Sequence, residues 1–403
     1  MPVSALLPGA VLAACALLGS CALRPANPEA AAAIHGGTLR EAGGRYRLDR
    51  SFQDFYDTAF VLTGGANQAP RAADLAQVAD ALSNYDVVFY GERHGHPGVH
   101  LQQMKLLRAL VERKPHWVLS FEQFERDVQG VVDDYLARRI GETQLIDKSR
   151  PWSNYAASYR PLLLFAREHQ LPVVAAEAPG WAISCVGQWG AAILDQFTPL
   201  ERSWVAADVH VAPGAYQDKF MAFLGHAADH GGGTAGSPES AAKSQRSFAA
   251  QVTRDDTMAE SIERAVRQHP GYKVLHLTGS FHSAAFLGTV ERLRMLDPAL
   301  KVAVIEPLEV EDPGAPAFGS DSLHDGTVLQ LIYPNPDLFA DGEDTAAFAK
   351  NMAHAHQMNR CQYSLPGAPD AGAPPDGSPA ALSGNYARSP WPPATPVESA
   401  HRR

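Results

Sequence analysis

The sequence has few cysteines and no cluster of basic residues. Only 4 cysteines occur in 403 residues, so a framework of disulfides is excluded and the fold must rest on a hydrophobic core. The formal net charge is −10, and without a run of Lys and Arg the chain is not expected to bind nucleic acid. Hydrophobic residues make up 45% of the chain and charged residues 19%, which is typical of a globular protein.

The first residues lack charge altogether. No charged side chain precedes Arg24, and residues 3–18 are mostly apolar, which suits a signal peptide over 1–21 and is short for a spanning helix. LGSC ends at Cys21 and resembles a lipobox, which predicts lipid attachment there. LAAC at 12–15 has the same pattern, and an ordinary cleaved signal is a further alternative. We expect an exported lipoprotein in a bacterial envelope, anchored in the outer membrane and facing the periplasm.

Composition divides the rest of the chain into segments. Residues 22–45 are rich in Ala, Gly and Pro and predict a flexible tether, followed by an α/β domain over 46–365. Within this domain, residues 181–260 have few strand signals and predict a helical insertion, which contains a Gly- and Ser-rich flexible loop at 229–244. Residues 366–403 are rich in Pro and Ala without periodicity and predict a disordered tail.

Cys185 and Cys361 are the cysteines that remain once the leader is removed. An oxidising compartment allows a disulfide between them, but two cysteines do not require one. The sequence therefore leaves their pairing open.

Six apolar runs of strand length alternate with segments of helical spacing. The runs are Val87–Tyr90, Trp117–Phe121, Pro172–Ala176, Val274–Leu277, Val302–Ile305 and Val328–Tyr333. Strands that alternate with helices predict an α/β fold, with a mostly parallel sheet covered by helices on both faces.

Polar side chains follow four of these runs. In open parallel sheets, ligands bind beyond the carboxyl ends of the strands, so these side chains are expected to meet at one edge. They are Glu92, His94, Glu122, Glu177 and His282. Two strand ends share the pattern Gly-x-x-His, at 91–94 and 279–282, in which glycine is expected to turn the backbone sharply.

Two imidazoles beside carboxylates can bind a divalent transition metal or transfer protons. We therefore predict His94 and His282 as metal ligands, and as a catalytic group together with Glu92 and Glu122. The alternative is two histidines that lie in loops without a shared role.

His96 and His100 lie close to His94 in the sequence. His96 precedes a proline in a loop, and His100 lies at the start of the following helix. We interpret both as solvated side chains, because only their proximity to His94 indicates a role.

The stretch RPWSNYAASYRP at 150–161 combines aromatic and basic residues. Tyr155 and Tyr159 are four residues apart and would share one face of a helical turn, flanked by Arg150 and Arg160. Phenolate oxygen suits ferric iron, aromatic rings suit a flat macrocycle, and arginine suits carboxylates such as propionates, so Tyr155, Tyr159 and Arg160 are candidate cofactor-binding residues. The alternative is an aromatic packing patch with surface arginines.

Four segments together match a known family in order. They are YDVVFYGERHGHPGVHLQQMKLL, WVLSFEQFERDVQGVVDDYL, RPWSNYAASYRPLLLFAREHQLPVVAAEAP and HLTGSFHSAAFLGTV. Over residues 50–335 the chain resembles the ChaN family of haem-binding envelope lipoproteins. That family shares a superfamily with the Tiki and TraB proteins and is similar to erythromycin esterases. The superfamily's shared marks correspond here to His94, His282 and Glu122.

The resemblance implies haem binding in iron acquisition, with Tyr155 or Tyr159 as the axial ligand. Because the family holds haem at a dimer interface, it also implies a homodimer. A haem-binding lipoprotein without catalysis is the leading hypothesis. The second is a metal-dependent hydrolase, a protease or esterase, that uses the paired Gly-x-x-His site. The third is an envelope scaffold with a relict site.

Overall fold

The structure is a computed structural model that describes residues 37–65, 68–229, 237–336 and 360–365. The predicted signal peptide, the lipidation site Cys21 and the predicted tail from 366 therefore lie outside the described residues. No helix in the described part of the chain is long and apolar enough to cross a membrane.

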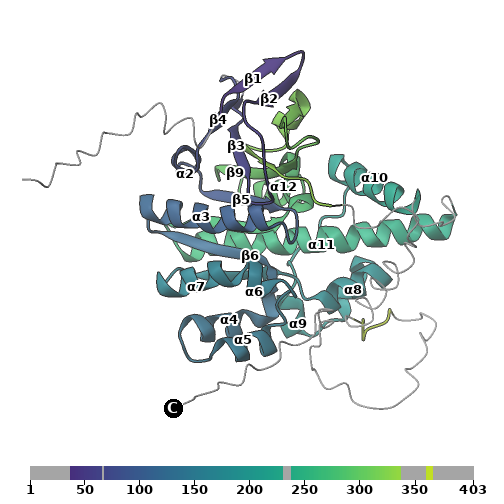
Figure 1. The fold of residues 1–403 in the computed structure, drawn as a ribbon. Coiled ribbons are helices and arrows are strands. Elements are labelled where there is room, and N and C mark those ends of the chain that lie inside the picture. The colour runs from purple at the N-terminus through teal and green to yellow at the C-terminus, as the bar shows by residue number, and fades with distance from the viewer. Residues whose placement is uncertain (1–36, 66–67, 230–236, 337–359, 366–403) are drawn as a thin grey trace, which may run out of the picture.

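A large sheet forms the centre of the fold (Figure 1). Its eight strands lie in the order β4-β3-β11-β9-β5-β8-β6-β7. Its strands are β3 Thr58–Leu62, β4 Arg71–Ala73, β5 Val87–Glu92, β6 Trp117–Glu125, β7 Val173–Glu177, β8 Lys273–Gly279, β9 Val302–Glu309 and β11 Val328–Ile332. The six strands from β11 to β7 run parallel, and β3 and β4 add antiparallel at one edge. These six are the predicted apolar runs, so the mostly parallel sheet is confirmed.

A second, three-stranded sheet lies beside the first and has the order β1-β2-β10. Its strands are β1 Leu39–Ala42, β2 Arg45–Leu48 and β10 Ala317–Gly319. The predicted tether over 22–45 is therefore wrong at its end, because residues 39–42 already pair with β2. Tyr46 and Leu48 alternate with exposed residues along β2, so they share the face of this strand that packs on the hydrophobic core. The Ala- and Gly-rich composition of residues 22–45 gave no indication of these strands.

Helices cover both faces of the large sheet. They are α2 Leu75–Leu82, α3 Pro97–Arg113, α4 Gln129–Leu136, α5 Glu142–Ser149, α6 Tyr155–Ser158, α7 Arg160–Glu168, α8 Gly180–Trp189, α9 Pro199–Ser203, α10 Ala215–Asp229, α11 Pro238–Gln268 and α12 Thr289–Leu296. Short 3₁₀ helices are Arg126–Val128, Ala191–Gln196, Ser280–His282, Ala284–Phe286 and Ser320–His324. Helices α2 to α7 share one hydrophobic cluster with the sheet, and α11 and α12 share another.

The alternation of side chains along β5 explains these two clusters. Val88 and Tyr90 are buried on the face that carries α3 and α7, whereas Val87 and Phe89 are buried against α11 and α12. A polar residue at the end of a strand therefore faces one helical layer or the other, according to its register.

Helix α11 shows that the second part of the predicted loop at 229–244 is helical. The same helix forms the C-terminal part of the helical insertion predicted over 181–260. Ser237 caps the helix by accepting a hydrogen bond from the backbone of Ser240, and Pro238 occupies the first turn, so the helix starts inside the predicted loop. The helix has 31 residues, contacts β6, β7 and β8, and crosses the sheet (Figure 1).

A disulfide joins Cys185 of α8 to Cys361, which resolves the pairing that the sequence left open. The bond holds residues 360–365 against the helical region. There the ring of Tyr363 lies 5.0 Å from that of Phe197, and its hydroxyl donates to Glu201 at 2.5 Å.

Candidate functional site at the carboxyl edge of the sheet

The two Gly-x-x-His glycines make room for side chains that arrive from other segments. A Cβ on Gly279 would lie 2.8 Å from Nε2 of His94, and one on Gly91 would lie 2.8 Å from Oε2 of Glu306 and 3.0 Å from Oγ of Ser280. Gly279 has a φ of −57°, which any residue can adopt. The expected sharp turn is therefore not what requires glycine; the close approach of His94 and Glu306 is.

Glu92 ends β5 on the α3 and α7 face and is the centre of the first polar network. Its Oε1 accepts hydrogen bonds from the Tyr159 hydroxyl at 2.6 Å and the Gln123 amide at 3.1 Å, and it lies 2.9 Å from Nδ1 of His94. Its Oε2 accepts from the Gln103 amide at 2.9 Å. Both carboxylate oxygens of this buried residue are thus satisfied.

The pKa of Glu92 lies below its ordinary value. Burial alone would raise this pKa, but the hydrogen bond with His94 and the charge of His100 outweigh burial and lower it. Glu92 is therefore an ionised carboxylate at neutral pH.

His94 is the accessible member of this network, because its side chain is 48% exposed. Its ring lies edge to face with Trp152, with the ring centroids 4.8 Å apart. Burial would lower the pKa of His94, but its hydrogen bond with Glu92 and the charge of Glu122 raise it. His94 is thus an imidazole at the surface of the edge, held at Nδ1 by a buried carboxylate.

Tyr155 and Tyr159 lie on one helical turn, as predicted, but both belong to the hydrophobic core. The Tyr159 hydroxyl donates to Glu92 at 2.6 Å, and the Tyr155 hydroxyl donates to Glu142 at 3.2 Å. Burial, together with the nearby carboxylates, raises the pKa of both phenols. Iron ligation by either tyrosine stays a prediction, and it requires a phenol to leave the core and its carboxylate.

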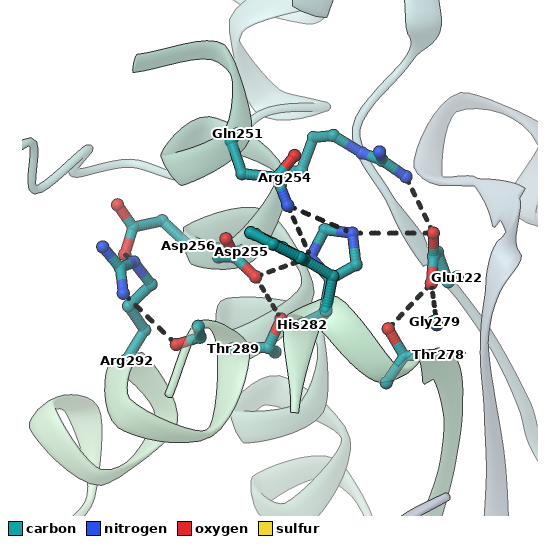
Figure 2. Close-up of polar contacts among 12 residues, drawn as sticks. Glu122, Gln251, Arg254, Asp255, Asp256, Thr278, Gly279, His282, Thr289 and Arg292 are labelled. Atoms are coloured by element: carbon teal, nitrogen blue, oxygen red, sulfur yellow. Dashed lines mark hydrogen bonds and ion pairs between the residues drawn. The ribbon is translucent and has the colours of Figure 1, made fainter. Parts of the chain in front are cut away.

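Glu122 is the centre of a second network, on the α11 face (Figure 2). Its Oε1 accepts from Arg254 at 2.8 Å, and its Oε2 accepts from the Thr278 hydroxyl at 2.7 Å and the Gly279 backbone at 2.6 Å. Nε2 of His282 lies 3.7 Å from Oε1. Burial would raise the pKa of Glu122, but the charges of His282 and Arg254 hold it well below its ordinary value.

His282 follows β8 in the 3₁₀ turn Ser280–His282 and pairs with a carboxylate from α11. Its Nδ1 lies 2.7 Å from Oδ1 of Asp255, which also accepts from the Thr289 hydroxyl at 2.8 Å (Figure 2). Burial would lower the pKa of His282, but the charges of Asp255 and Glu122 raise it. A carboxylate on each side can hold a proton on this imidazole, although its side chain is only 5% exposed.

The sequence interpretation missed Arg254 and Asp255. Arg254 bridges Glu122 and Glu177, at 2.8 and 2.7 Å from their carboxylate oxygens. The available signal was Arg254-Asp255-Asp256, three successive charged residues on a helix with apolar spacing around them. Three successive positions span more than half of the helix circumference, so at least one of them is expected close to the buried face.

The predicted residues therefore meet at one edge but divide between two faces. Glu92 faces α3 and α7, whereas Glu122 and His282 face α11, and His94 lies over Gly279 between them. No group of three side chains suited to a metal ion occurs among the residues that the structure describes. Metal binding by the pair His94 and His282 therefore stays a prediction.

His96 and His100 are not solvated, so that interpretation is wrong. His96 is fully buried, lies 2.8 Å from the Tyr333 carbonyl through Nε2, and caps α3 by accepting from the backbone of Val99. His100 is 6% exposed, and its Nδ1 lies 2.9 Å from the Gln103 side-chain oxygen. Both histidines shape the turn and the helix that position His94.

The fold and this edge define a class: α/β proteins with a mostly parallel sheet whose carboxyl edge carries buried ionised side chains on both faces. Residues 78–293, more than half of the chain, match the model of the family described as haem-binding uptake, Tiki superfamily, ChaN. The chain belongs to this family, which confirms the resemblance seen in its sequence.

Solved structures similar to this chain include a ChaN protein and an erythromycin esterase. ChaN of Campylobacter jejuni, with cofacial haem, is 15% identical with a TM-score of 0.49, covering 69% of this chain and 98% of that chain. The erythromycin esterase EreC, as a mutant in its open conformation, is 13% identical with a TM-score of 0.36, covering 65% and 83%. No curated protein matches the chain.

Proposed function

We propose that this protein binds haem at the carboxyl edge of its sheet, as part of iron acquisition, with His94 as the side chain that faces the iron. The observation that supports this proposal is membership of a haem-binding uptake family, whose model spans Glu92, His94, Glu122 and His282. Haem supplies iron as cargo, so no catalytic step is required of the edge.

The chemistry of His94 fits haem iron. Imidazole is a common axial ligand, and ligating histidines usually donate their other N–H to a carboxylate, which fixes the tautomer. Glu92 lies 2.9 Å from Nδ1 of His94 and is positioned for this role, so the iron would bind at Nε2, which lies over Gly279 in the structure. The Trp152 ring beside His94 adds an aromatic surface suited to a macrocycle.

Tyrosine ligation is the other arrangement that the family resemblance implies. Tyr155 and Tyr159 are 3% and 0% exposed, so each would have to move before it reached a ligand. Arg160, the third predicted cofactor-binding residue, donates to Glu142 at 2.6 Å. We therefore propose His94 ahead of these residues.

We also propose a location in the bacterial envelope, with the chain anchored through Cys21 and facing the periplasm. The lipobox-like sequence supports the anchor, and the disulfide between Cys185 and Cys361 is typical of an oxidising compartment. A homodimer remains a prediction from the family. The comparisons do not favour the metal-dependent hydrolase, and it stays an alternative prediction.

A hemin titration tests the proposal. Protein lacking residues 1–21 should give a saturable Soret shift, and His94→Ala should weaken binding by about tenfold or more, because an iron bond is lost. His116→Ala is the matched control, since His116 is an exposed histidine just before β6, at the opposite edge of the sheet. A featureless wild-type titration, or equal affinities for the wild type and His94→Ala, would contradict the proposal.

A further inference from the structure

The arginines first expected to bind carboxylates of a ligand are already paired within the protein. Arg150 donates to Glu125 at 2.6 Å and to Asp127 at 2.7 Å, and Arg160 donates to Glu142 at 2.6 Å. An arginine that is hydrogen-bonded to carboxylates of its own chain must share or give up that pairing to bind an incoming anion. A cation without such a hydrogen bond is the stronger candidate for the acidic edge of a haem.

Arg93 is placed differently. It lies between Glu92 and His94 at the carboxyl edge, and its side chain is 42% exposed. Its ion-pair partner in the described part of the chain is Glu306, with NH2 and Oε1 3.8 Å apart, which is beyond hydrogen-bond distance. The guanidinium of Arg93 therefore makes no hydrogen bond with Glu306, and its N–H groups there remain donors for a ligand.

Glu306 does not neutralise Arg93 at neutral pH. Its side chain is 5% exposed, and its Oε2 has no hydrogen-bond partner among the described residues. Burial raises the pKa of Glu306 to about 8, against the lowering effect of the Arg93 charge. At pH 7 the carboxyl is mostly protonated, so Glu306 does not offset the positive charge of Arg93. Asp325 is a second carboxyl whose charge reaches Arg93 and Lys219.

An exposed aromatic surface lies beside this charge. Lys219 of α10 donates to the Phe281 carbonyl at 3.1 Å and lies 4.7 Å from the Phe281 ring centroid. Glu306, the partner of Arg93, approaches the same turn, because a Cβ on Gly91 would lie 2.8 Å from Oε2 of Glu306 and 3.0 Å from Oγ of Ser280, the residue before Phe281. The Phe223 ring is 5.5 Å from that of Phe281 and is 56% exposed, so cations border an aromatic surface here.

We infer that Arg93 binds the propionate carboxylates of haem, with Lys219 as a second cation and the rings of Phe223 and Phe281 beside the macrocycle. The inference rests on the proposed haem binding and names the residue that recognises the ligand's acidic edge. Haem is a flat apolar ring with two carboxylates on one side, which matches an aromatic surface bordered by cations. Arg93 directly precedes His94, so a single turn would carry both contacts.

Comparing hemin with hemin dimethyl ester tests this role, because the ester keeps the iron and the ring but lacks both negative charges. Wild-type protein without residues 1–21 should bind hemin about tenfold or more tightly than the ester, since charge-assisted hydrogen bonds are lost. Arg93→Ala should remove most of this preference by weakening hemin binding alone. Arg93→Lys should keep part of it, because the charge remains without the bidentate geometry.

Arg139→Ala is the control, since Arg139 is 61% exposed and pairs with Asp134 away from this edge. It should leave both affinities unchanged. Equal wild-type affinities for hemin and its ester, or an unchanged preference in Arg93→Ala, would overturn the role of Arg93 while leaving haem binding intact. A wild type that binds neither porphyrin would overturn the proposed function as well.

Discussion

Glu92 and Glu122 are the same residue type near the ends of two strands that only β8 separates, yet they are stabilised differently. Their side chains are 0% and 1% exposed. Around Glu92 the donors are two amides and a phenol, together with the half-exposed His94. Around Glu122 the donors include the charged guanidinium of Arg254.

This difference separates a part of the edge that can respond to a ligand from a part that holds the fold together. His94 can turn toward a ligand while the neutral donors still satisfy Glu92. Loss of Arg254 would instead leave Glu122 and Glu177 buried without their cation. The iron is therefore expected to bind at His94, beside Glu92.

Glu306 is a buried carboxyl at the same edge whose nearby donor groups, Arg93 at 3.8 Å and the Ser280 hydroxyl, do not outweigh burial. Its Oε2 is unpaired among the described residues, and burial raises its pKa to about 8. The three glutamates thus span three solutions to burial: neutral donors together with histidines, an arginine, and retention of a proton.

Replacing Arg254 should have the largest effect on stability. Arg254→Met leaves two buried carboxylates without their shared cation, so the free energy of unfolding should fall by about 3 kcal/mol or more in urea unfolding at pH 7. Arg267→Ala is the control, because its pair with Glu263 is on the surface with Arg267 69% exposed, and it should cost about 0.5 kcal/mol or less.

The matched change in the first network is Tyr159→Phe, which removes one hydrogen bond to the Glu92 carboxylate. It should lower the free energy of unfolding by about 1.5–3 kcal/mol, less than Arg254→Met, because the amides and His94 remain. If Tyr159→Phe costs more than Arg254→Met, the contrast between neutral and charged stabilisation is wrong.

Glu306 should give a pH dependence of its own. Its pKa is about 8 in the folded protein and near 4.5 when exposed, so the folded state holds an extra proton between these values. Stability from this group therefore falls as pH rises through that window, by up to about 1.4 kcal/mol per pH unit. Glu306→Gln should remove this slope in urea unfolding at pH 5.5, 6.5 and 7.5.

Glu311→Gln serves as the comparison for that slope, because the Glu311 side chain is 84% exposed, and its pH profile should follow the wild type. Parallel profiles for the wild type and Glu306→Gln would show that Glu306 ionises normally in the folded protein.

The central sheet and the position of the site could be predicted from sequence. Fully buried parallel strands are continuous apolar runs, and the rule that ligands bind at their carboxyl ends placed Glu92, His94, Glu122 and His282 together. The division between two faces follows from strand alternation. The sequence prediction grouped the four residues as one cluster at the sheet edge and did not assign them to faces, so it did not include this division.

Other features could not be read from local patterns. Arg254 lies 132 residues from Glu122, and only tertiary packing of α11 brings them together. The short strands β1, β4 and β10 have three or four residues, too few to show periodicity. The burial of Tyr155 and Tyr159 likewise depends on contacts with distant elements.

Resonance Raman spectroscopy of the reduced hemin complex tests the central claim most directly, because it identifies the iron ligand. The account predicts an iron–histidine stretching band in the wild-type protein that disappears in His94→Ala and persists in His116→Ala. A spectrum without that band, combined with a tyrosinate signal in the ferric complex that Tyr155→Phe or Tyr159→Phe abolishes, would contradict it.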